Sequence, residues 1–159
     1  MAKSLKPIPD GYHSITASLT CKDATKAIEF YKKAFGAEEI FRMPAPGGKV
    51  GHAELQIGDS KIFVNDEFPE QGATAPTSTA GIYLYLYVKD VDAVFKGALE
   101  LGAKQAMPVT DMFWGDRYGK VIDPSGYQWG ISTHTEDVSP EEMDRRSKEF
   151  AKKMAAGQS

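Results

Sequence analysis

Cysteine is nearly absent from this chain of 159 residues, and its single copy, Cys21, excludes an internal disulfide. Cys21 ends an alternation with Ile15, Ala17 and Leu19 that places apolar side chains on one face of a predicted strand. A cysteine in such a pattern is expected to be a small core residue rather than a nucleophile.

Positive charge is not in excess either. Lys and Arg number 19 against 22 Asp and Glu, which gives a net charge of -3. Proteins that bind nucleic acids usually carry a basic surface, so we expect no nucleic-acid partner. No apolar run is long enough to span a bilayer, and we expect no membrane partner. The first residues, MAKSLKPIPDGYHS, lack the apolar segment of a secretory signal, so we predict a cytoplasmic location.

Two common catalytic signatures are also missing. No glycine-rich phosphate loop precedes a helix, and no Ser-His-Asp or Cys-His set has a supporting spacing. The composition is otherwise ordinary, with 42% hydrophobic and 26% charged residues. It indicates a soluble globular protein with one domain or two small repeats.

The first half of the chain predicts a β-α-β-β-β unit. Residues 14–20 alternate between apolar and small polar side chains, as a strand with one buried face does. Asp23 is placed to cap a helix over residues 24–35, and Gly36 to end it. Further strands are predicted over 37–43, 50–57 and 61–65, with His52, Glu54 and Gln56 opposite the apolar face.

The same order returns in the second half. Asp90 follows Asp23 by 67 residues, and Leu86 follows Leu19 by the same interval. Residues 82–88 alternate again and place Tyr83, Tyr85 and Tyr87 on one face. A ladder of three tyrosines is unusual for a solvated face. Each half then has one uncovered sheet face, and pairing the halves would enclose it.

We therefore divide the chain into an N-terminal arm (1–12), a domain (13–135) and a C-terminal helix (136–159). The domain consists of modules 13–66 and 81–135, joined by a linker, 67–80, that is rich in turn formers. Ser139, followed by Pro140 and Glu142, predicts a capped start for the last helix.

The stretch from Phe113 to Ser132 organises the second half. A strand over 117–122 and a Pro-Gly turn at 123–126 lead to a closing strand, in which Trp129 is expected to face the core. Phe113, Trp114 and Tyr118 either stack on a planar ligand, or fill the cavity or pack on another subunit. Arg117 is expected to pair with Asp116 or to meet an anionic ligand.

These features resemble the glyoxalase/bleomycin-resistance group, the vicinal oxygen chelate superfamily. The segments that carry the resemblance are KDATKAIEFYKKAFGAEE, KDVDAVFKGALELGAK and DPSGYQWGI. The PhnB-like branch of this group is the part that the chain resembles through two further segments, GHAELQIGDS and FWGDRYGKVIDPSGYQWGISTHTEDVSPEEM. The resemblance implies an α+β, glyoxalase-like fold of two βαβββ modules that form a curved, cup-shaped mixed sheet. It also implies a homodimer, which is common in the group.

Metal-dependent members of the group place His or Glu at four positions that face into the cup. By register with the family pattern, these positions fall at Thr16, Phe63, Tyr83 and Gly130. None of the four supplies the imidazole or carboxylate that a divalent ion of the glyoxalase type needs. We therefore expect no metal, no other cofactor and no catalytic residue.

The leading hypothesis is a metal-free protein that binds, and thereby sequesters, an antibiotic or another small aromatic or amphipathic molecule. The residues predicted to contact the ligand are Thr16, His52, Glu54, Gln56, Phe63, Tyr83, Tyr85, Trp114, Arg117, Tyr118 and Gly130. The alternative is a divalent-metal-dependent lyase, isomerase or dioxygenase that holds its ion with His13, His52 and Glu54. A third hypothesis is a structural or regulatory dimer whose cup is filled by its own side chains. The pattern names no ligand, and it leaves open whether modules pair within one chain or between chains.

Overall fold

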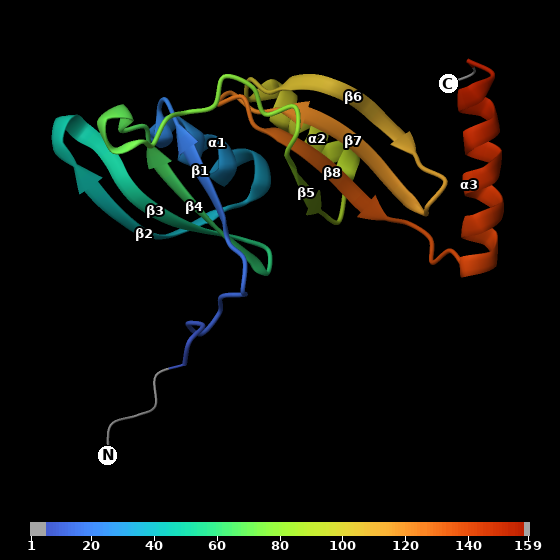
Figure 1. Ribbon diagram of the computed structural model, residues 1–159, viewed down its shortest axis with the longest axis horizontal. Coiled ribbons are helices and arrows are strands. Elements are labelled where there is room, and N and C mark those ends of the chain that lie inside the picture. The colour runs from blue at the N-terminus through green and yellow to red at the C-terminus, as the bar shows by residue number, and fades with distance from the viewer. Residues whose placement is uncertain (1–5, 158–159) are drawn as a thin grey trace. The chain divides into compact units, whose positions relative to one another are not determined.

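A computed structural model describes residues 6–157 and divides into two compact units, residues 1–78 and 79–159 (Figure 1). The first five residues of the predicted arm and the last two of the predicted C-terminal segment lie outside this description. Each unit has its own four-stranded sheet, and each sheet has a helix packed on one face.

The first unit contains β1 (Ala17–Cys21), α1 (Ala24–Phe35), β2 (Glu38–Ala45), β3 (Lys49–Ile57) and β4 (Ser60–Asp66). Short 3-10 turns lie between β2 and β3, at Pro46–Gly48, and after β4, at Pro69–Gln71. The strand order is β1-β4-β3-β2, in which only β1 and β4 are parallel. Ile28 and Tyr31 of α1 are fully buried, because the helix turns its apolar stripe to the sheet.

The second unit repeats this order with β5 (Tyr83–Tyr87), α2 (Val91–Glu100), β6 (Lys104–Asp111), β7 (Asp116–Ile122) and β8 (Gln128–His134). Its strand order is β5-β8-β7-β6, and β5 is parallel to β8. The predicted α+β, glyoxalase-like fold is thus confirmed. Trp129 is 3% exposed, and its indole Nε1 donates to Asp123 Oδ2 at 2.9 Å.

The duplication extends to individual contacts. Ala17 lies opposite Ile62 in the β1–β4 pair, and Leu84 lies opposite Trp129 in the β5–β8 pair, 67 residues later on both strands. The backbone N–H at the start of α1 (Ala24) donates to Asp66 Oδ1 at 2.8 Å. At the equivalent place the N–H of Val91 donates to Thr133 Oγ1 at 2.9 Å. The end of the last strand therefore caps the helix in both units.

The predicted first strand was too long at its N-terminal end. Strand β1 begins at Ala17, and Ile15 is 89% exposed instead of facing the core. The ladder with β4 begins at the Ala17–Ile62 pair, and the first two residues of β4, Ser60 and Lys61, pair with β3 and not with β1. Strand β6 runs from Lys104 to Asp111. It tolerates Pro108 because it is an edge strand.

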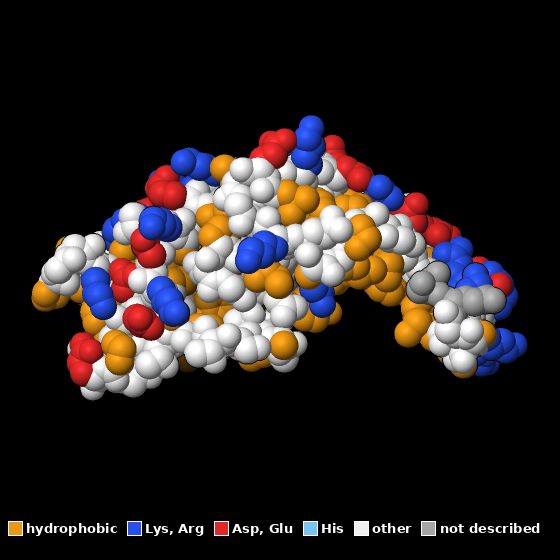
Figure 2. Space-filling model, turned by 90° about the horizontal axis from the view of Figure 1, so that it is seen from above, with side chains coloured by type: hydrophobic (Ala, Val, Ile, Leu, Met, Phe, Trp, Pro, Cys, Tyr) orange, Lys and Arg blue, Asp and Glu red, His pale blue; other side chains and the backbone are white. Residues whose placement is uncertain are grey.

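The last helix, α3 (Pro140–Ala155), begins as predicted, with the Ser139 side chain accepting from the backbone N–H of Glu142. No helix in residues 6–157 is both long enough and apolar enough to cross a membrane. Figure 2 shows one face of the molecule, on which acidic and basic side chains are interspersed, in keeping with the small net charge of -3.

Candidate ligand-binding site

The second unit presents a sheet face built largely from tyrosines. Tyr85 lies opposite Gly130 of β8, and Gly130 lies opposite Lys120 of β7, so these three positions form one row across three strands. Because side chains two apart on a strand share a face, the neighbouring rows add further tyrosines. We define the tyrosine face as Tyr83, Tyr85, Tyr87, Tyr118, Lys120 and Gly130. The three tyrosines of β5 remain 47%, 38% and 61% exposed, in chain order.

Tyr118 forms the floor of this face. Its side chain is 5% exposed, and its ring stacks on Tyr85 with centroids 5.3 Å apart and planes 12° from parallel. A Cβ atom placed on Gly130 would lie 2.7 Å from Tyr118 Cε2. The Tyr118 ring therefore fills the space that any side chain at residue 130 would need. Burial, reinforced by the neighbouring phenols of Tyr83 and Tyr85, raises the pKa of Tyr118 to about 12.

A buried carboxylate holds one end of the face. Asp116 is 3% exposed, and its Oδ2 accepts from the hydroxyls of Tyr85 and Tyr87, both at 3.1 Å. The same oxygen accepts from Trp114 Nε1 at 3.2 Å, while Oδ1 lies 2.8 Å from His134 Nδ1. Burial alone would raise the pKa of this carboxyl, but the hydrogen bonds from its four donors outweigh burial and lower it. Asp116 thus orients three aromatic rings and stays ionised.

His134 connects this carboxylate to the segment before α3. Its Nε2 lies 2.8 Å from Asp137 Oδ1, so the ring is placed between two carboxylates. The hydrogen bonds to Asp137 and then to Asp116 raise the pKa of His134. The His134 side chain is 52% exposed, although both of its nitrogens are engaged.

The loop that carries Trp114 is fixed from two sides. Gly115 O accepts from the backbone N–H groups of Thr135 and Glu136 at 2.9 and 3.0 Å. Gly115 has φ 95°, and a Cβ there would lie 2.2 Å from Glu136 O, so only glycine fits.

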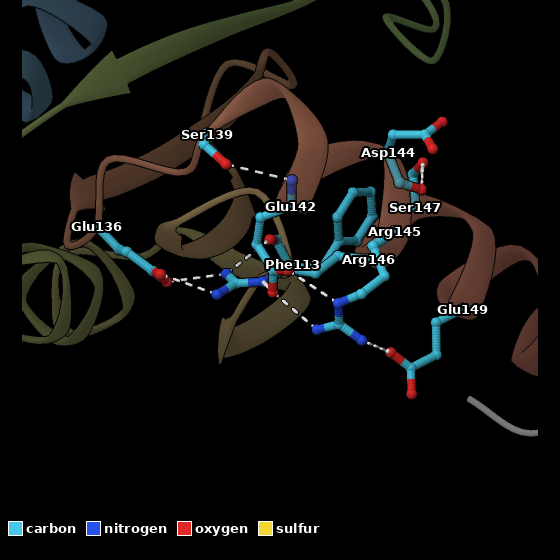
Figure 3. A network of polar contacts seen from close by, with 9 residues as sticks. All are labelled: Phe113, Glu136, Ser139, Glu142, Asp144, Arg145, Arg146, Ser147 and Glu149. Atoms are coloured by element: carbon cyan, nitrogen blue, oxygen red, sulfur yellow. Dashed lines mark hydrogen bonds and ion pairs between the residues drawn. The ribbon is translucent and has the colours of Figure 1, made fainter.

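Helix α3 supplies the second restraint on this loop. Arg146 donates to both carboxylate oxygens of Glu136 at 2.8 Å and to Phe113 O at 3.2 Å (Figure 3). Phe150 packs on Phe113 with centroids 5.0 Å apart. Phe113 is therefore part of the contact with α3 rather than of the tyrosine face.

Arg117 lies on the opposite face of β7, because it alternates with Asp116 and Tyr118. Its guanidinium donates to both oxygens of Asp92 on α2, at 2.7 and 2.8 Å, and to Asp111 at 3.1 Å. The expected pair with Asp116 does not form. Arg117 is bonded on the helix-covered side, so the structure separates it from the other residues predicted to contact a ligand.

The corresponding face of the first unit has different chemistry. Phe63 lies between Ser18 and Glu54 in the sheet, and the His52 ring meets the Phe63 ring edge-on with centroids 4.8 Å apart. His52 Nε2 is 3.4 Å from Glu54 Oε1, while Glu54 Oε2 accepts from the hydroxyl of Tyr12. The hydrogen bond from Tyr12, aided by His52, lowers the pKa of Glu54 against the effect of burial.

The two other residues of this unit that were predicted to contact a ligand, Gln56 and Thr16, lie near the ends of strands. Gln56 donates to Gly58 O at 2.8 Å within the β3–β4 turn, and Thr16 precedes β1 outside the ladder. Tyr12, from the predicted arm, packs near Phe63 with centroids 6.0 Å apart, and Lys61 Nζ lies 4.7 Å from its ring centroid. The arm therefore covers part of this face.

The four positions carried over from the family pattern do not fit a divalent metal. Phe63 has no donor atom, and the place of a side chain at Gly130 is taken by the Tyr118 ring. Among residues 6–157, no group of three or more His, Cys, Asp or Glu side chains is arranged to hold a metal ion. His13 in particular does not join His52 and Glu54 in such a group.

The structure brings together Tyr83, Tyr85, Trp114, Tyr118 and Gly130 in one unit, and His52, Glu54 and Phe63 in the other. The sequence-based prediction missed Asp116 as the hydrogen-bonding centre, and it missed Lys120. Asp116 and Lys120 lie two positions before and after Tyr118, so strand alternation places them on the same face as Tyr118. This alternation could have been recognised in the sequence. Tyr12 could not have been found, because nothing in the sequence indicates where the arm packs.

Comparison with known proteins agrees with the fold. The family model of the Glyoxalase/Bleomycin resistance protein/Dioxygenase superfamily matches residues 12–131. The chain belongs to this superfamily. A similar relative in it is the uncharacterized protein Mb0911c of Mycobacterium bovis, 39% identical over 135 residues, which are 82% of this chain and 89% of the relative.

Solved structures also resemble this chain. TioX from Micromonospora sp. ML1 has a TM-score of 0.61 and 28% identity, over 77% of this chain and 98% of TioX. A Bacillus cereus protein described as a putative 3-demethylubiquinone-9 3-methyltransferase, PhnB protein, has a TM-score of 0.64 over 76% of this chain and 99% of its own. At 20% identity the second likeness shows the fold alone.

Proposed function

We propose that this superfamily member is a small-molecule-binding protein that holds a planar aromatic or amphipathic compound without a metal ion. The observation that carries the proposal is the tyrosine face, on which Tyr83, Tyr85 and Tyr87 keep 38% to 61% of their surface exposed. Exposed rings held in fixed orientations stack on a flat ligand at little entropic cost. Trp114, tied to Asp116 beside them, would add a further stacking surface.

The donor chemistry supports binding over metal-dependent catalysis. A hydroxyl, a phenyl ring, a phenol and a glycine replace the imidazoles and carboxylates that ions of the glyoxalase type prefer. A protein that sequesters a toxic compound such as an antibiotic has to bind the compound tightly, but it does not have to catalyse a reaction. Sequestration in the cytoplasm is therefore the biological role that we propose.

A thermal-shift screen of planar aromatic compounds tests the proposal. A ligand present at 100 times its Kd stabilises the folded state by about 2.7 kcal/mol, so binding should appear as a saturable rise in Tm. Tyr85→Leu should weaken binding by about tenfold or more, because ring stacking contributes on the order of 1–3 kcal/mol. Tyr127→Leu, in the turn before β8 and outside the tyrosine face, is the matched control. The proposal fails if no compound gives saturable stabilisation, or if both variants bind alike.

The alternative function, a divalent-metal enzyme, has its own test. Purification without chelator, followed by metal analysis, would yield a stoichiometric ion that is lost in His52→Ala if His52 and Glu54 hold a metal. The 3.4 Å contact between those two side chains is the feature that favours this alternative. The third hypothesis, a cup filled by the protein's own side chains, is favoured by the Tyr118 ring over Gly130. Failure of the thermal-shift screen would support that hypothesis.

A further inference from the structure

Lys120 is the cation of the tyrosine face. Its Nζ lies 4.1 Å from the ring centroid of Tyr83, and its position on β7 is opposite Gly130, in the same row as Tyr85. Within residues 6–157 no carboxylate lies within ion-pair distance of this ammonium group, whereas Lys96 of the same unit pairs with Glu100. Lys120 is half-buried, so its charge is neither neutralised by the protein nor fully solvated.

Among residues 6–157, the one carboxylate that bonds to the tyrosines of this face is already satisfied. Asp116 accepts two tyrosine hydroxyls, the Trp114 indole and a bond from His134. These four donors use its two oxygens, and none of them is Lys120. The face therefore combines exposed aromatic rings with the ammonium group of Lys120, which has no acidic counterpart in the part of the chain that the structure describes.

The first unit does not share this arrangement. Its face carries Glu54 and His52, and Lys61 there lies over the ring of Tyr12, which itself bonds to Glu54. The two faces thus differ in charge although their strands pair in the same register.

We propose that the tyrosine face selects planar aromatic anions, meaning molecules that carry a carboxylate, sulfonate or phosphate on an aromatic ring. The ring stacks on Tyr83 and Tyr85, and the anionic group pairs with Lys120. A charge-assisted hydrogen bond to a partly desolvated ammonium is stronger than a neutral one, so the anion gains affinity over a neutral molecule of the same shape. This inference rests on the proposed binding function and deepens it.

A matched set of probes tests the inference on the full chain: 2-naphthoate, neutral 2-naphthamide and cationic 2-naphthylmethylamine, measured by calorimetry at low salt. We expect 2-naphthoate to bind about tenfold more tightly than 2-naphthamide, because one bond to a charged group is involved. Lys120→Gln should reduce the affinity for 2-naphthoate to that of the amide and leave the amide unchanged. Lys120→Glu should reverse the preference and favour the amine. Lys96→Gln, on α2 and away from the face, should change nothing.

The outcomes separate the two proposals. Equal affinities for the three probes, or full affinity of Lys120→Gln for 2-naphthoate, would overturn the selection of anions while the binding function stands. No binding of any probe to the wild-type chain would overturn both. Thermal unfolding of each variant establishes that it is folded before its affinity is compared.

Discussion

Gly130 and Tyr118 depend on each other. The Tyr118 ring occupies the space above Gly130, and a Cβ there would approach it to 2.7 Å. We therefore expect Gly130→Ala to lower the free energy of unfolding by about 1–3 kcal/mol, the usual effect of forcing extra volume into a packed site. Chemical denaturation of the variant and the wild type measures the difference.

Gly97→Ala is the matched control, because a Cβ at this position of α2 meets no atom within 4 Å. It should be neutral or stabilising by up to about 1 kcal/mol, since alanine favours helices over glycine. Introducing Gly130→Ala into a Tyr118→Leu background should cost less than it does in the wild type. An equal cost in both backgrounds would contradict the proposed steric conflict.

His134 makes stability depend on pH. Its folded-state pKa is raised by Asp137 and Asp116 above the ordinary 6.5, so the folded state binds its proton more tightly than the unfolded state does. The resulting stabilisation is fully present below pH 6.5 and is lost as the pH rises through the folded-state pKa. The difference in Tm between wild type and His134→Gln should therefore shrink as the pH rises from 6 to 9. The change should be no larger than one titrating histidine causes. Parallel pH curves for the two proteins would contradict this role.

Individual side chains differ in how far the sequence predicted them. The aromatic residues Tyr83, Tyr85 and Tyr87 were placed on one face, because strand alternation depends only on local geometry. Arg117 was expected beside Asp116, but alternation sends adjacent residues to opposite faces, and Asp92 of α2 supplies the partner instead. The Arg117–Asp92 pair depends on which helix covers the sheet. The residues next to Arg117 in the sequence do not contain that information.

Helix α3 restrains the aromatic loop through one arginine. Arg146 binds Glu136 and the carbonyl of Phe113, whereas Arg145 binds Glu142 and Glu149 within its own helix (Figure 3). Arg146→Ala should therefore speed amide hydrogen exchange at residues 113–116 on the order of tenfold, since local opening becomes easier. Arg145→Ala, which removes the same charge from the same helix, should leave this exchange unchanged. Equal exchange in the two variants would show that Arg146 does not restrain the loop.

The helices were predicted better than the strands. The range of α1 matched because Asp23 and Gly36 mark both ends chemically, the first by accepting from the N–H of Lys26 and the second by a left-handed φ of 65°. The start of β1 did not match, because the length of a strand is set by its pairing, and the ladder between β1 and β4 begins only at the Ala17–Ile62 pair. Local signals therefore fix helix ends, while strand ends depend on pairing.

We expect the whole protein to be a homodimer in solution. Ile40, Phe41 and Met43 on the edge strand β2 are each about half exposed, at 50%, 50% and 48%. Edge strands with exposed apolar side chains are usually covered by another element or chain. Light scattering should give twice the 17.4 kDa mass of one chain. Phe41→Lys should shift the equilibrium toward the monomer by at least about tenfold, because it places a charge in an apolar contact. A wild-type mass of one chain would contradict the expectation.

The close contact between Tyr118 on β7 and Gly130 on β8 also limits how this protein is able to evolve. A histidine or glutamate arising at position 130 would collide with the Tyr118 ring, and losing that ring first would leave a hole beneath Tyr85. Either mutation alone is harmful, so acquiring a chelating side chain there requires both changes together. This epistasis makes the acquisition of a metal ligand at position 130 a rare event, and it leaves selection free to act on the ligands that the rings accept.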